Sequence, residues 1–528
     1  MRAQTLRSAH PLAIGIWDVA AASAIPDGGL LAVQVGEQAL LLSRVGEEVH
    51  AVSGTCPHAG APLAEGVRCG HHIVCPWHKA SFDLRTGARM EPPAVDGLRR
   101  FPARIVGGRV LLTPPGDLTE PVAGPADSRC FVILGAGAAG QSAAQTLRAE
   151  GFGGRLVMIS REDALPYDRT ILSKYTLSGQ EGGEKTPLQE ASFYERHRIE
   201  RRMAEVTQLD TVAGSVSFED GSMLAYDAAL VATGGVPRRP DLPGAELAGI
   251  FLLRAPADAE AILAATQSAR HVVVVGGGFI GMEAAASLRE RGLDVTVVLP
   301  EAVPFEKQVG RDIGAVFARL HEEKGVVLRS HQTVAAFEGE GRVRAVLLEG
   351  GERIAADLVV LGSGITPATG FIQGLDMTDD GGVAVDRFLC ARDGLYAAGD
   401  LASFPIFGDG PDTRIEHWRV AQQQGRAAAL NMLGRRVAFE AVPYFWTIHF
   451  LKRLDYVGHA TEWDDILVDG SLEKPEFVAL MVKGGRVVAA LGWDRDADMA
   501  RLLCLLEHRR DWAPHALLAA LAKVPSVT

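Results

Sequence analysis

The sequence predicts a multidomain chain with a small antiparallel β domain, two α/β domains and a C-terminal α+β domain. The first 113 residues hold short stretches of alternating polarity, such as Leu30–Val35 and Arg109–Leu112. Two Gly-x-Gly-x-x-Gly motifs, at 135–140 and 276–281, each follow a strand-like run and precede a helix-like run. Near the end, strand-like runs at 444–450, 477–482 and 486–493 precede an apolar helical run at 499–507. At 528 residues, the chain is long enough for three or four such domains.

Within the first domain, two short runs offer metal ligands: Cys56-Pro57-His58 and Cys75-Pro76-Trp77-His78. Each run supplies one thiolate and one imidazole from a tight turn, because a proline follows each cysteine. This pattern favours a [2Fe–2S] cluster in which Cys56 and Cys75 hold one iron and His58 and His78 hold the other. A Cys2His2 zinc site is the alternative. Zinc-finger spacing, however, places both cysteines in one run and both histidines in the other.

The ligand runs and their flanks resemble the soluble, ferredoxin-type Rieske family. The likeness continues through 82–87 to the turn at Gly107 and Gly108. High-potential Rieske proteins carry two further cysteines beside the ligand runs, whereas here Cys69 stands alone. The residues at 59–61 and 79–81 are small or flexible, so backbone N–H groups could approach the sulfides, and such groups tune a cluster's potential.

The first glycine motif lies between a predicted strand and a predicted helix, the context in which it indicates dinucleotide binding. It follows the strand-like run Cys130–Leu134 and precedes a helical run at 142–150. Gly135 permits the turn, Gly137 lets a pyrophosphate approach, and Gly140 lets helix and strand pack closely. The helix N-terminus then faces the phosphates. The second motif has the same setting, after His271–Val275 and before a helical run at 282–291. Two such units suggest two nucleotides, one resident flavin and one exchanging nicotinamide.

Two further motifs decide which nucleotide belongs to which unit. Residues 165–174 read Leu-Pro-Tyr-Asp-Arg-Thr-Ile-Leu-Ser-Lys, and a strand-like run ends in Gly399-Asp400. With these motifs, 129–450 resembles the ferredoxin-reductase and apoptosis-inducing-factor family of flavoproteins, and the N-terminal extension resembles its Rieske-bearing, apoptosis-inducing-factor-3-like members. The resemblance implies a Rieske domain at 1–113, a linker at 114–128, a C-terminal reductase-type domain at 437–528, and two Rossmann-like domains. The FAD domain (129–252 and 376–436) would be split by an inserted NAD domain (253–375).

The resemblance also implies site residues. Glu162 is the candidate for the adenosine ribose of FAD, although the family's acid can fall one position earlier, where this chain has Arg161. Arg169 and Lys174 would lie beside the flavin, and Lys174 would pair with Glu283 near the nicotinamide as the catalytic pair. The implied FAD-binding residues are Gly135, Gly137, Ala138, Ala139, Gly140, Glu162, Arg169, Lys174, Val206, Arg254, Asp400, His417 and Trp446.

The second unit would bind the nicotinamide cofactor. Its implied contacts are Gly277, Gly278, Phe279, Ile280, Glu301, Gly364 and Glu416. Glu301 falls where an acid accepts hydrogen bonds from the adenosine ribose, whereas an NADPH site would need an arginine for the 2′-phosphate. The stretch 296–306 contains neither Arg nor Lys, which favours NADH over NADPH.

Cysteine placement argues against thiol chemistry at the flavin. Some relatives of this fold use a reactive cysteine in the stretch that here reads 169–175, and none is present there. Cys130, Cys390 and Cys504 are most economically core residues, the usual place of a free cysteine.

Composition sets the remaining bounds. The formal net charge is −12, which argues against a general nucleic-acid binder. No apolar run reaches membrane-spanning length, and the N-terminus lacks the apolar stretch of a signal peptide, so a soluble cytoplasmic protein is expected. The family's C-terminal domain often supports dimers, so the resemblance makes a homodimer one expected assembly.

The expected function is an electron relay. NADH would give a hydride to FAD, and the electrons would pass singly to the [2Fe–2S] cluster and on to an unidentified acceptor, since the cofactors do the chemistry. Two alternatives stay open at this point: a binding or signalling protein switched by its redox state, and the reductase component of an oxygenase system.

Overall fold

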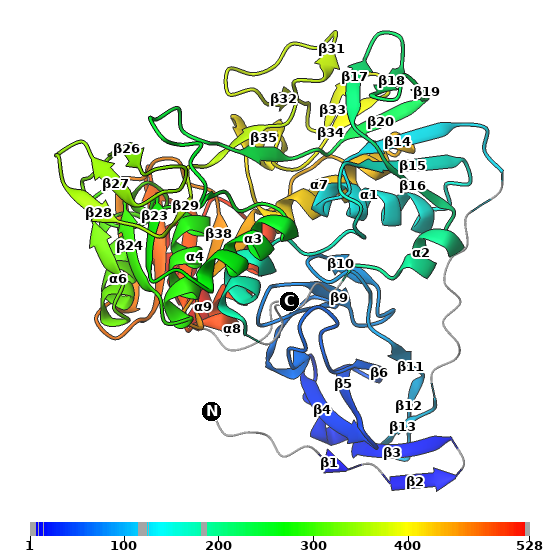
Figure 1. Cartoon of the computed structure of the whole chain (residues 1–528). Coiled ribbons are helices and arrows are strands. Elements are labelled where there is room, and N and C mark those ends of the chain that lie inside the picture. The colour runs from blue at the N-terminus through cyan, green and yellow to red at the C-terminus, as the bar shows by residue number, and fades with distance from the viewer. Residues whose placement is uncertain are drawn as a thin grey trace.

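The computed structural model describes residues 7–8, 10–13, 15–114, 124, 126–180 and 187–522. The N-terminal β region lies beneath the rest of the molecule, and the remaining chain forms two α/β units and a C-terminal sheet (Figure 1). Most of the expected linker at 114–128 lies outside the described residues. Among those described, no helix combines the length and apolar character needed to cross a membrane.

The N-terminal region consists of three small sheets. Their strand orders are β1-β4-β5-β6-β11, β12-β13-β3-β2 and β10-β9-β8-β7. Every pairing is antiparallel except that of β1 with β4. The strands are β1 Arg7–Ser8, β2 His10–Ala13, β3 Ile16–Ala21, β4 Leu30–Val35, β5 Gln38–Val45, β6 Glu48–Ser53, β7 Val67–Cys69, β8 His72–Val74, β9 Ser81–Asp83, β10 Arg89–Glu91, β11 Arg100–Phe101, β12 Ala103–Val106 and β13 Arg109–Leu112.

The first α/β unit is built from two separate stretches of chain. Its six-stranded sheet has the order β16-β15-β14-β20-β34-β33 and is parallel except for the edge strand β33. The strands are β14 Cys130–Leu134, β15 Arg155–Ser160, β16 Ile199–Met203, β20 Ala228–Val231, β33 Cys390–Arg392 and β34 Leu395–Ala397. Helices α1 (Ala138–Ala149) and α7 (Trp418–Met432) lie side by side on it (Figure 1).

The second α/β unit lies in sequence between those two stretches. Its parallel sheet has the order β22-β29-β23-β24-β25. The strands are β22 Ile250–Phe251, β23 His271–Val275, β24 Asp294–Val298, β25 Val327–Arg329 and β29 Leu358–Leu361. The accompanying helices are α3 Pro256–Thr266, α4 Phe279–Glu290, α5 Glu306–Val309 and α6 Arg311–Glu323.

Both nucleotide-type helices begin earlier than the sequence suggested. The expected starts were 142 and 282, whereas α1 begins at Ala138 and α4 at Phe279. In each case a glycine of the motif, Gly137 or Gly278, is the extended N-cap residue. The last part of each motif therefore forms the first helical turn, which brings backbone N–H groups to the mouth of the glycine turn.

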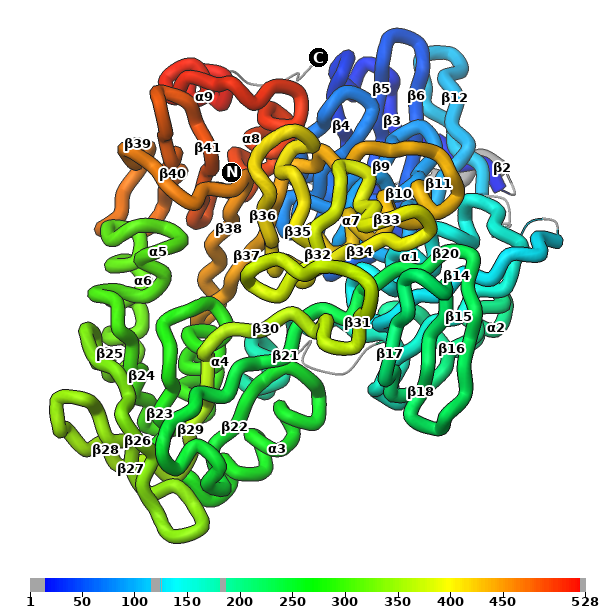
Figure 2. The backbone as a smooth tube through the Cα atoms, turned by 90° about the horizontal axis from the view of Figure 1, so that it is seen from above, coloured from blue at the N-terminus to red at the C-terminus, as the bar shows by residue number. Residues whose placement is uncertain are grey.

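The C-terminal region is an antiparallel sheet covered by two helices. Its strand order is β37-β38-β41-β40-β39. The elements are β37 Tyr444–His449, β38 Lys452–Gly458, β39 Asp465–Ser471, β40 Glu476–Lys483, β41 Arg486–Trp493, α8 Asp496–His508 and α9 Pro514–Ala522. This sheet shares a hydrophobic core with the second α/β unit, and Figure 2 shows β37 beside α4 of that unit.

The N-terminal region docks on α7 and the C-terminal region. The Arg419 side chain of α7 is fully buried and donates to the Pro92 carbonyl at 2.8 Å. Lys79, also fully buried, forms an ion pair with Asp455 of β38 at 2.6 Å. Helix α8 contacts β7 through a small apolar cluster. Figure 2 shows the N-terminal strands beside α7 and α8.

Candidate functional site

The four predicted ligands form two matched pairs. The thiols of Cys56 and Cys75 are in hydrogen-bonding contact, and the thiol of Cys56 lowers the pKa of Cys75 to about 6 by donating to it. The Nδ1 atoms of His58 and His78 lie 3.1 Å apart. Cys56-Pro57-His58 lies between β6 and β7, and 75–78 lies between β8 and β9, so two loops meet tip to tip.

The two ligand loops share one backbone design. The amide of Cys56 donates to the Ala61 carbonyl at 2.8 Å, and that of Cys75 donates to the Ala80 carbonyl at 2.8 Å. Four residues after each cysteine the chain is left-handed, with φ 79° at Gly60 and φ 59° at Lys79. The stretch 79–81 was expected to be small or flexible. Lys79 instead holds a strained conformation with a fully buried side chain.

This donor set fits a [2Fe–2S] cluster. Such a centre needs two thiolates on one iron and two imidazoles on the other, which is how the pairs are arranged. A single zinc ion would need all four side chains around one point. Across the described part of the chain, no three His, Cys, Asp or Glu side chains are placed to share one metal ion. The arrangement therefore favours the two-iron centre over zinc.

The first glycine turn shows why three of its residues lack side chains. A Cβ on Gly140 would lie 1.9 Å from the Gly135 carbonyl oxygen, so only glycine lets α1 approach the turn. Gly135 itself has φ 111° and would place a Cβ 2.2 Å from the Ala232 carbonyl oxygen. At Gly137 a Cβ would meet nothing within 4 Å. Gly137 thus faces open space, as close approach of a phosphate requires.

That open space is part of a cavity of about 520 Å³. All the predicted FAD-side residues line it except Gly140, which instead packs against Gly135. The lining residues among the predictions are Gly135, Gly137, Ala138, Ala139, Glu162, Arg169, Lys174, Val206, Arg254, Asp400, His417, Trp446, Phe279, Ile280, Glu283 and Glu416. The volume lies in the usual range for ligand sites.

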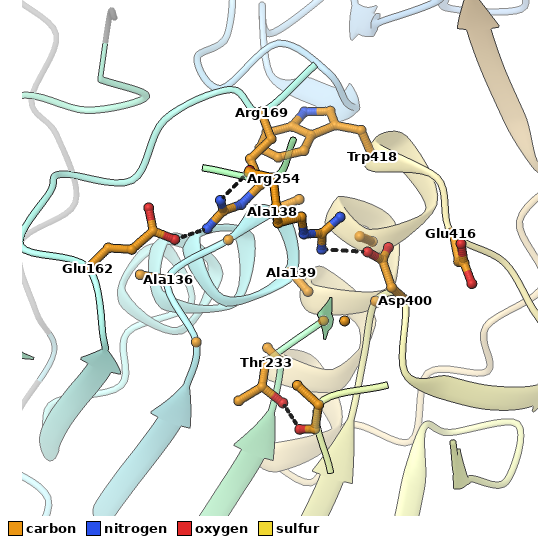
Figure 3. Close-up of a pocket in the computed structure, with 18 of the residues that line it drawn as sticks. Ala136, Ala138, Ala139, Glu162, Arg169, Thr233, Arg254, Asp400, Glu416 and Trp418 are labelled. Atoms are coloured by element: carbon orange, nitrogen blue, oxygen red, sulfur yellow. Dashed lines mark hydrogen bonds and ion pairs between the residues drawn. The ribbon is translucent and has the colours of Figure 1, made fainter. Parts of the chain in front are cut away.

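Two ion pairs flank the glycine turn. Arg169 contacts both Glu162 and the Tyr167 hydroxyl, and Arg254 contacts Asp400 at 2.8 Å. Figure 3 shows these pairs on either side of the α1 N-terminus, with Asp400 and Glu416 on the side away from Glu162. Arg161, the alternative to Glu162, has a side chain 64% exposed and pairs with Glu205 at 3.8 Å.

Glu283 is held by groups from three regions of the chain. Lys174, on a helical turn at Leu172–Thr176, contacts its Oε2 at 3.1 Å, as the sequence predicted. Ser173 also donates to Oε2, at 2.5 Å, and Thr447 of β37 donates to Oε1 at 2.6 Å. The Thr447 hydroxyl also lies 2.8 Å from Nε2 of His449. Ser173 and Thr447 were missed, since nothing in their local sequence distinguishes them from core residues.

The second glycine turn repeats the first. A Cβ on Gly281 would lie 2.5 Å from the Gly276 carbonyl oxygen, and a Cβ on Gly278 would meet nothing within 4 Å. Gly276, Gly278 and Gly281 therefore correspond to Gly135, Gly137 and Gly140. Gly277 instead faces inward, where a Cβ would meet the Leu299 side chain at 2.9 Å.

Four predicted nicotinamide-side residues lie outside the cavity: Gly277, Gly278, Glu301 and Gly364. They follow the carboxyl ends of the adjacent parallel strands β23, β24 and β29, where ligands of such sheets bind. Glu301 pairs with Lys307 at 2.8 Å. Lys307 is the first residue after the stretch 296–306, which contains neither Arg nor Lys. The sequence argument from that stretch therefore overlooked a positive charge that contacts Glu301.

His417 provides a further sign that a ligand belongs in the cavity. Its Nδ1 atom is buried without a hydrogen-bond partner, and burial lowers its pKa to about 3. Buried polar atoms in folded proteins are nearly always paired. Together with the open space at Gly137, this orphaned nitrogen fits a polar group such as a flavin nucleotide.

The cavity and the cysteine–histidine loops are neighbours. The ring of Trp446, which lines the cavity, packs on the ring of His78 with centroids 4.5 Å apart. On the other side, His58 Nε2 lies 3.9 Å from Oδ2 of Asp168, next to the cavity residue Arg169. Sequence reasoning missed Asp168 and Asp455, because their partners His58 and Lys79 are in another domain.

Comparison with known proteins agrees with this geometry. Residues 130–425 match the pyridine nucleotide-disulphide oxidoreductase family, 16–102 match the Rieske [2Fe-2S] domain, and 444–524 match the reductase C-terminal domain. The chain is 34% identical to human (Homo sapiens) apoptosis-inducing factor 3 over 505 residues, covering 92% of this chain and 83% of that protein.

Reductases of oxygenase systems are also similar. The ferredoxin reductase component of chlorobenzene dioxygenase from Cupriavidus sp. (strain PS12) is 35% identical over 388 residues, covering 73% of this chain and 94% of that protein. The covalent putidaredoxin reductase–putidaredoxin complex is a structural neighbour, with TM-score 0.70 and 30% identity over 74% of this chain and 96% of that chain. The chain therefore belongs to the pyridine nucleotide-disulphide oxidoreductase family, as a ferredoxin-reductase-like oxidoreductase with an N-terminal Rieske [2Fe–2S] domain.

Proposed function

We propose that the protein oxidises NADH and passes the electrons through its own Rieske domain to an external acceptor. When bound, FAD would take a hydride from NADH, and the [2Fe–2S] cluster would take the electrons from FAD one at a time. The observation that carries this proposal is the contact between Trp446 and His78, at 4.5 Å between ring centroids. The contact supports the proposal because His78, a predicted cluster ligand, lies against the wall of the cavity proposed for FAD.

The chain's own residues would position the cofactors. Gly137 and the α1 N-terminus would bind the FAD pyrophosphate, and Glu162 its adenosine ribose. Gly278 and the α4 N-terminus would do the same for NADH, with Glu301 at its ribose. Lys174 would place a fixed positive charge beside the flavin ring, and Glu283 would hold Lys174 in place. No side chain has to act as an acid or base.

Rapid mixing of the anaerobic holoprotein with NADH tests the relay. We expect the flavin absorbance to bleach and a Rieske-type EPR signal to follow. Trp446→Ala should slow the appearance of the EPR signal more than the bleaching, because it removes the contact between the cavity and His78. Trp463→Ala is the matched control, since Trp463 packs against the hydrophobic core on the opposite face of the C-terminal sheet from Trp446. Bleaching without an EPR signal in the wild type would contradict the relay.

A second candidate follows from the relatives. Several are reductase components of dioxygenase systems, so the external acceptor would be a ferredoxin or an oxygenase component. Steady-state reduction of such proteins at rates matching NADH oxidation would support this. Slow turnover with every acceptor would favour a redox-switched signalling protein instead.

The cytoplasmic location and the homodimer stay predictions.

A further inference from the structure

A second pair of cysteines meets at the interface between the N-terminal and C-terminal regions. Cys69 is the last residue of β7, and Cys504 lies on α8. Their side chains are in hydrogen-bonding contact, and they are 7% and 0% exposed. Val67, Val74 and Ala500 complete the apolar cluster around them. Cys69 stands alone in the sequence and Cys504 was expected to be a core residue, so the fold creates this pair.

The two thiols have different surroundings. The Cys504 thiol donates a hydrogen bond to Cys69, and this bond together with burial raises the pKa of Cys504. On the other side, His508 Nδ1 lies 4.0 Å from Cys69 Sγ. That nitrogen also lies 2.7 Å from the Cys504 carbonyl oxygen, so it carries a proton. Cys69 therefore lies between the Cys504 thiol and the His508 ring, with its sulfur in contact with both.

From this geometry we infer that Cys69 and Cys504 form a redox-active dithiol, which hydrogen peroxide oxidises to a disulfide joining the Rieske domain to the C-terminal domain. This site is separate from the cluster ligands Cys56 and Cys75, and it does not depend on the proposed relay. Hydrogen peroxide is close to water in size, so it suits a sulfur atom that is only slightly exposed.

The oxidation is balanced as follows. The Cys69 thiolate attacks one peroxide oxygen and the O–O bond breaks, which gives a sulfenic acid on Cys69 and, with the proton lost from Cys69, one water. The Cys504 thiol then attacks the sulfenic sulfur, the S–O bond breaks, and a second water leaves with the Cys504 proton. Two thiols have lost two electrons and two protons, and one peroxide has become two waters.

The disulfide would fix the docked arrangement. Cys69 and Cys504 are far apart in the chain, so their bond ties the Rieske domain covalently to α8. Lys79 and Asp455 join the same two regions without a covalent bond, through a hydrogen-bonded ion pair. Oxidation would therefore add a covalent bond to a non-covalent contact between the domains, and a thiol reductant would break that bond again.

Peptide mapping of the holoprotein tests the inference. The protein is treated with stoichiometric peroxide, remaining thiols are alkylated, and a non-reducing digest is analysed by mass spectrometry. We expect one linked Cys69–Cys504 peptide pair and an intact mass lower by about 2 Da, both reversed by dithiothreitol. The visible absorbance of the cluster should stay unchanged, which separates this reaction from oxidation of Cys56 and Cys75.

Two test variants and one control variant show which cysteines form the linked peptide. Cys69→Ser and Cys504→Ser should abolish the linked peptide, whereas Cys390→Ser, at a cysteine in a different sheet, should leave its yield unchanged. In the wild-type protein, full alkylation of Cys69 and Cys504 after peroxide treatment would overturn the inference. So would sulfinic acid on Cys69 with no link to Cys504. Neither result depends on whether a variant folds.

Discussion

Around Glu283, three donors contact one carboxylate: Lys174 from the first α/β unit, Ser173 beside it, and Thr447 from β37. The resemblance to the flavoprotein family implied the pairing of Lys174 with Glu283, and the two side chains are in contact. It could not predict Thr447, because the threonine is brought in by the packing of the C-terminal sheet against α4. Residues that act through tertiary contacts leave no local pattern.

Thr447→Val tests this contact. The valine removes the donor to Glu283 Oε1, leaving a buried acceptor unpaired, which costs about 1–3 kcal/mol in the free energy of unfolding. Thr447→Ser keeps the hydroxyl and should cost less than the valine. Urea unfolding of the three proteins measures the difference. Equal midpoints for the valine and serine variants would show that the hydrogen bond contributes nothing.

Lys79 is a charged residue whose environment the sequence also failed to predict. Its sequence context suggested a short, flexible stretch, yet its ammonium group is buried against Asp455. A lysine is rarely buried unless it is paired, and the partner lies in another domain. The four predicted cluster ligands, by contrast, lie in one short stretch of chain where their spacing forms a pattern, and the structure brings them together in pairs.

At the scale of elements, the two strand–turn–helix units were predictable and their helix starts were not. The periodic apolar run marks the body of each helix, but α1 and α4 begin inside the glycine motif itself. The first turn of α1 holds only small residues before Gln141 (Ala138, Ala139 and Gly140), which give no apolar periodicity. The first turn of α4 begins with Phe279 and Ile280 but contains Gly281, and glycine is a poor helix former. The geometry of the turn, rather than the side-chain pattern, decides where the helix starts.

The equivalence of the two turns allows a paired test. Gly140→Ala would place a methyl group 1.9 Å from the Gly135 oxygen, and Gly281→Ala would place one 2.5 Å from the Gly276 oxygen. We expect Gly140→Ala to lose FAD on purification. Gly281→Ala should retain FAD, because its turn belongs to the other unit, but should need more than tenfold higher NADH for half-maximal flavin bleaching. Loss of FAD from both variants would contradict the separation of the two sites.

At the scale of the whole molecule, the domains could be recognised but their arrangement could not. Each domain carries its own hydrophobic pattern, whereas the docking contacts are single residues such as Arg419, Lys79 and Asp455. The contribution of the buried pair Lys79–Asp455 to stability can be measured directly. An exposed Lys–Asp pair, Lys452–Asp494, involves the same strand and serves as a control.

Asp455→Ala would leave the buried Lys79 ammonium without its carboxylate and would also remove the ion pair with Arg453. Breaking a buried pair in this way costs about 3–5 kcal/mol. Asp494→Ala is the control. It breaks the pair with Lys452 at 3.0 Å, both side chains of which are about half exposed, and should cost less than about 1 kcal/mol. Thermal unfolding of both variants is the measurement. Equal losses would show that the buried pair does not hold the interface.

Buried neutral histidines make the stability depend on pH. Burial lowers the pKa of His417 to about 3, below its unfolded value near 6.5. The unfolded state therefore binds more protons than the folded state between these values, and stability present above pH 6.5 is lost as the pH falls towards 3. The slope should be up to about 1.4 kcal/mol per pH unit. Urea unfolding at a series of pH values measures it, and His417→Gln should flatten the profile. A wild-type stability that rises on acidification from pH 6.5 to 5 would contradict this.

The burial of the cluster ligands has a consequence for how the protein matures. Cys56, Cys75 and His78 are 2%, 1% and 8% exposed in the docked arrangement. A scaffold or carrier protein that delivers iron and sulfide could not reach them there. We therefore expect the predicted cluster to be inserted before the N-terminal domain closes onto the rest of the chain.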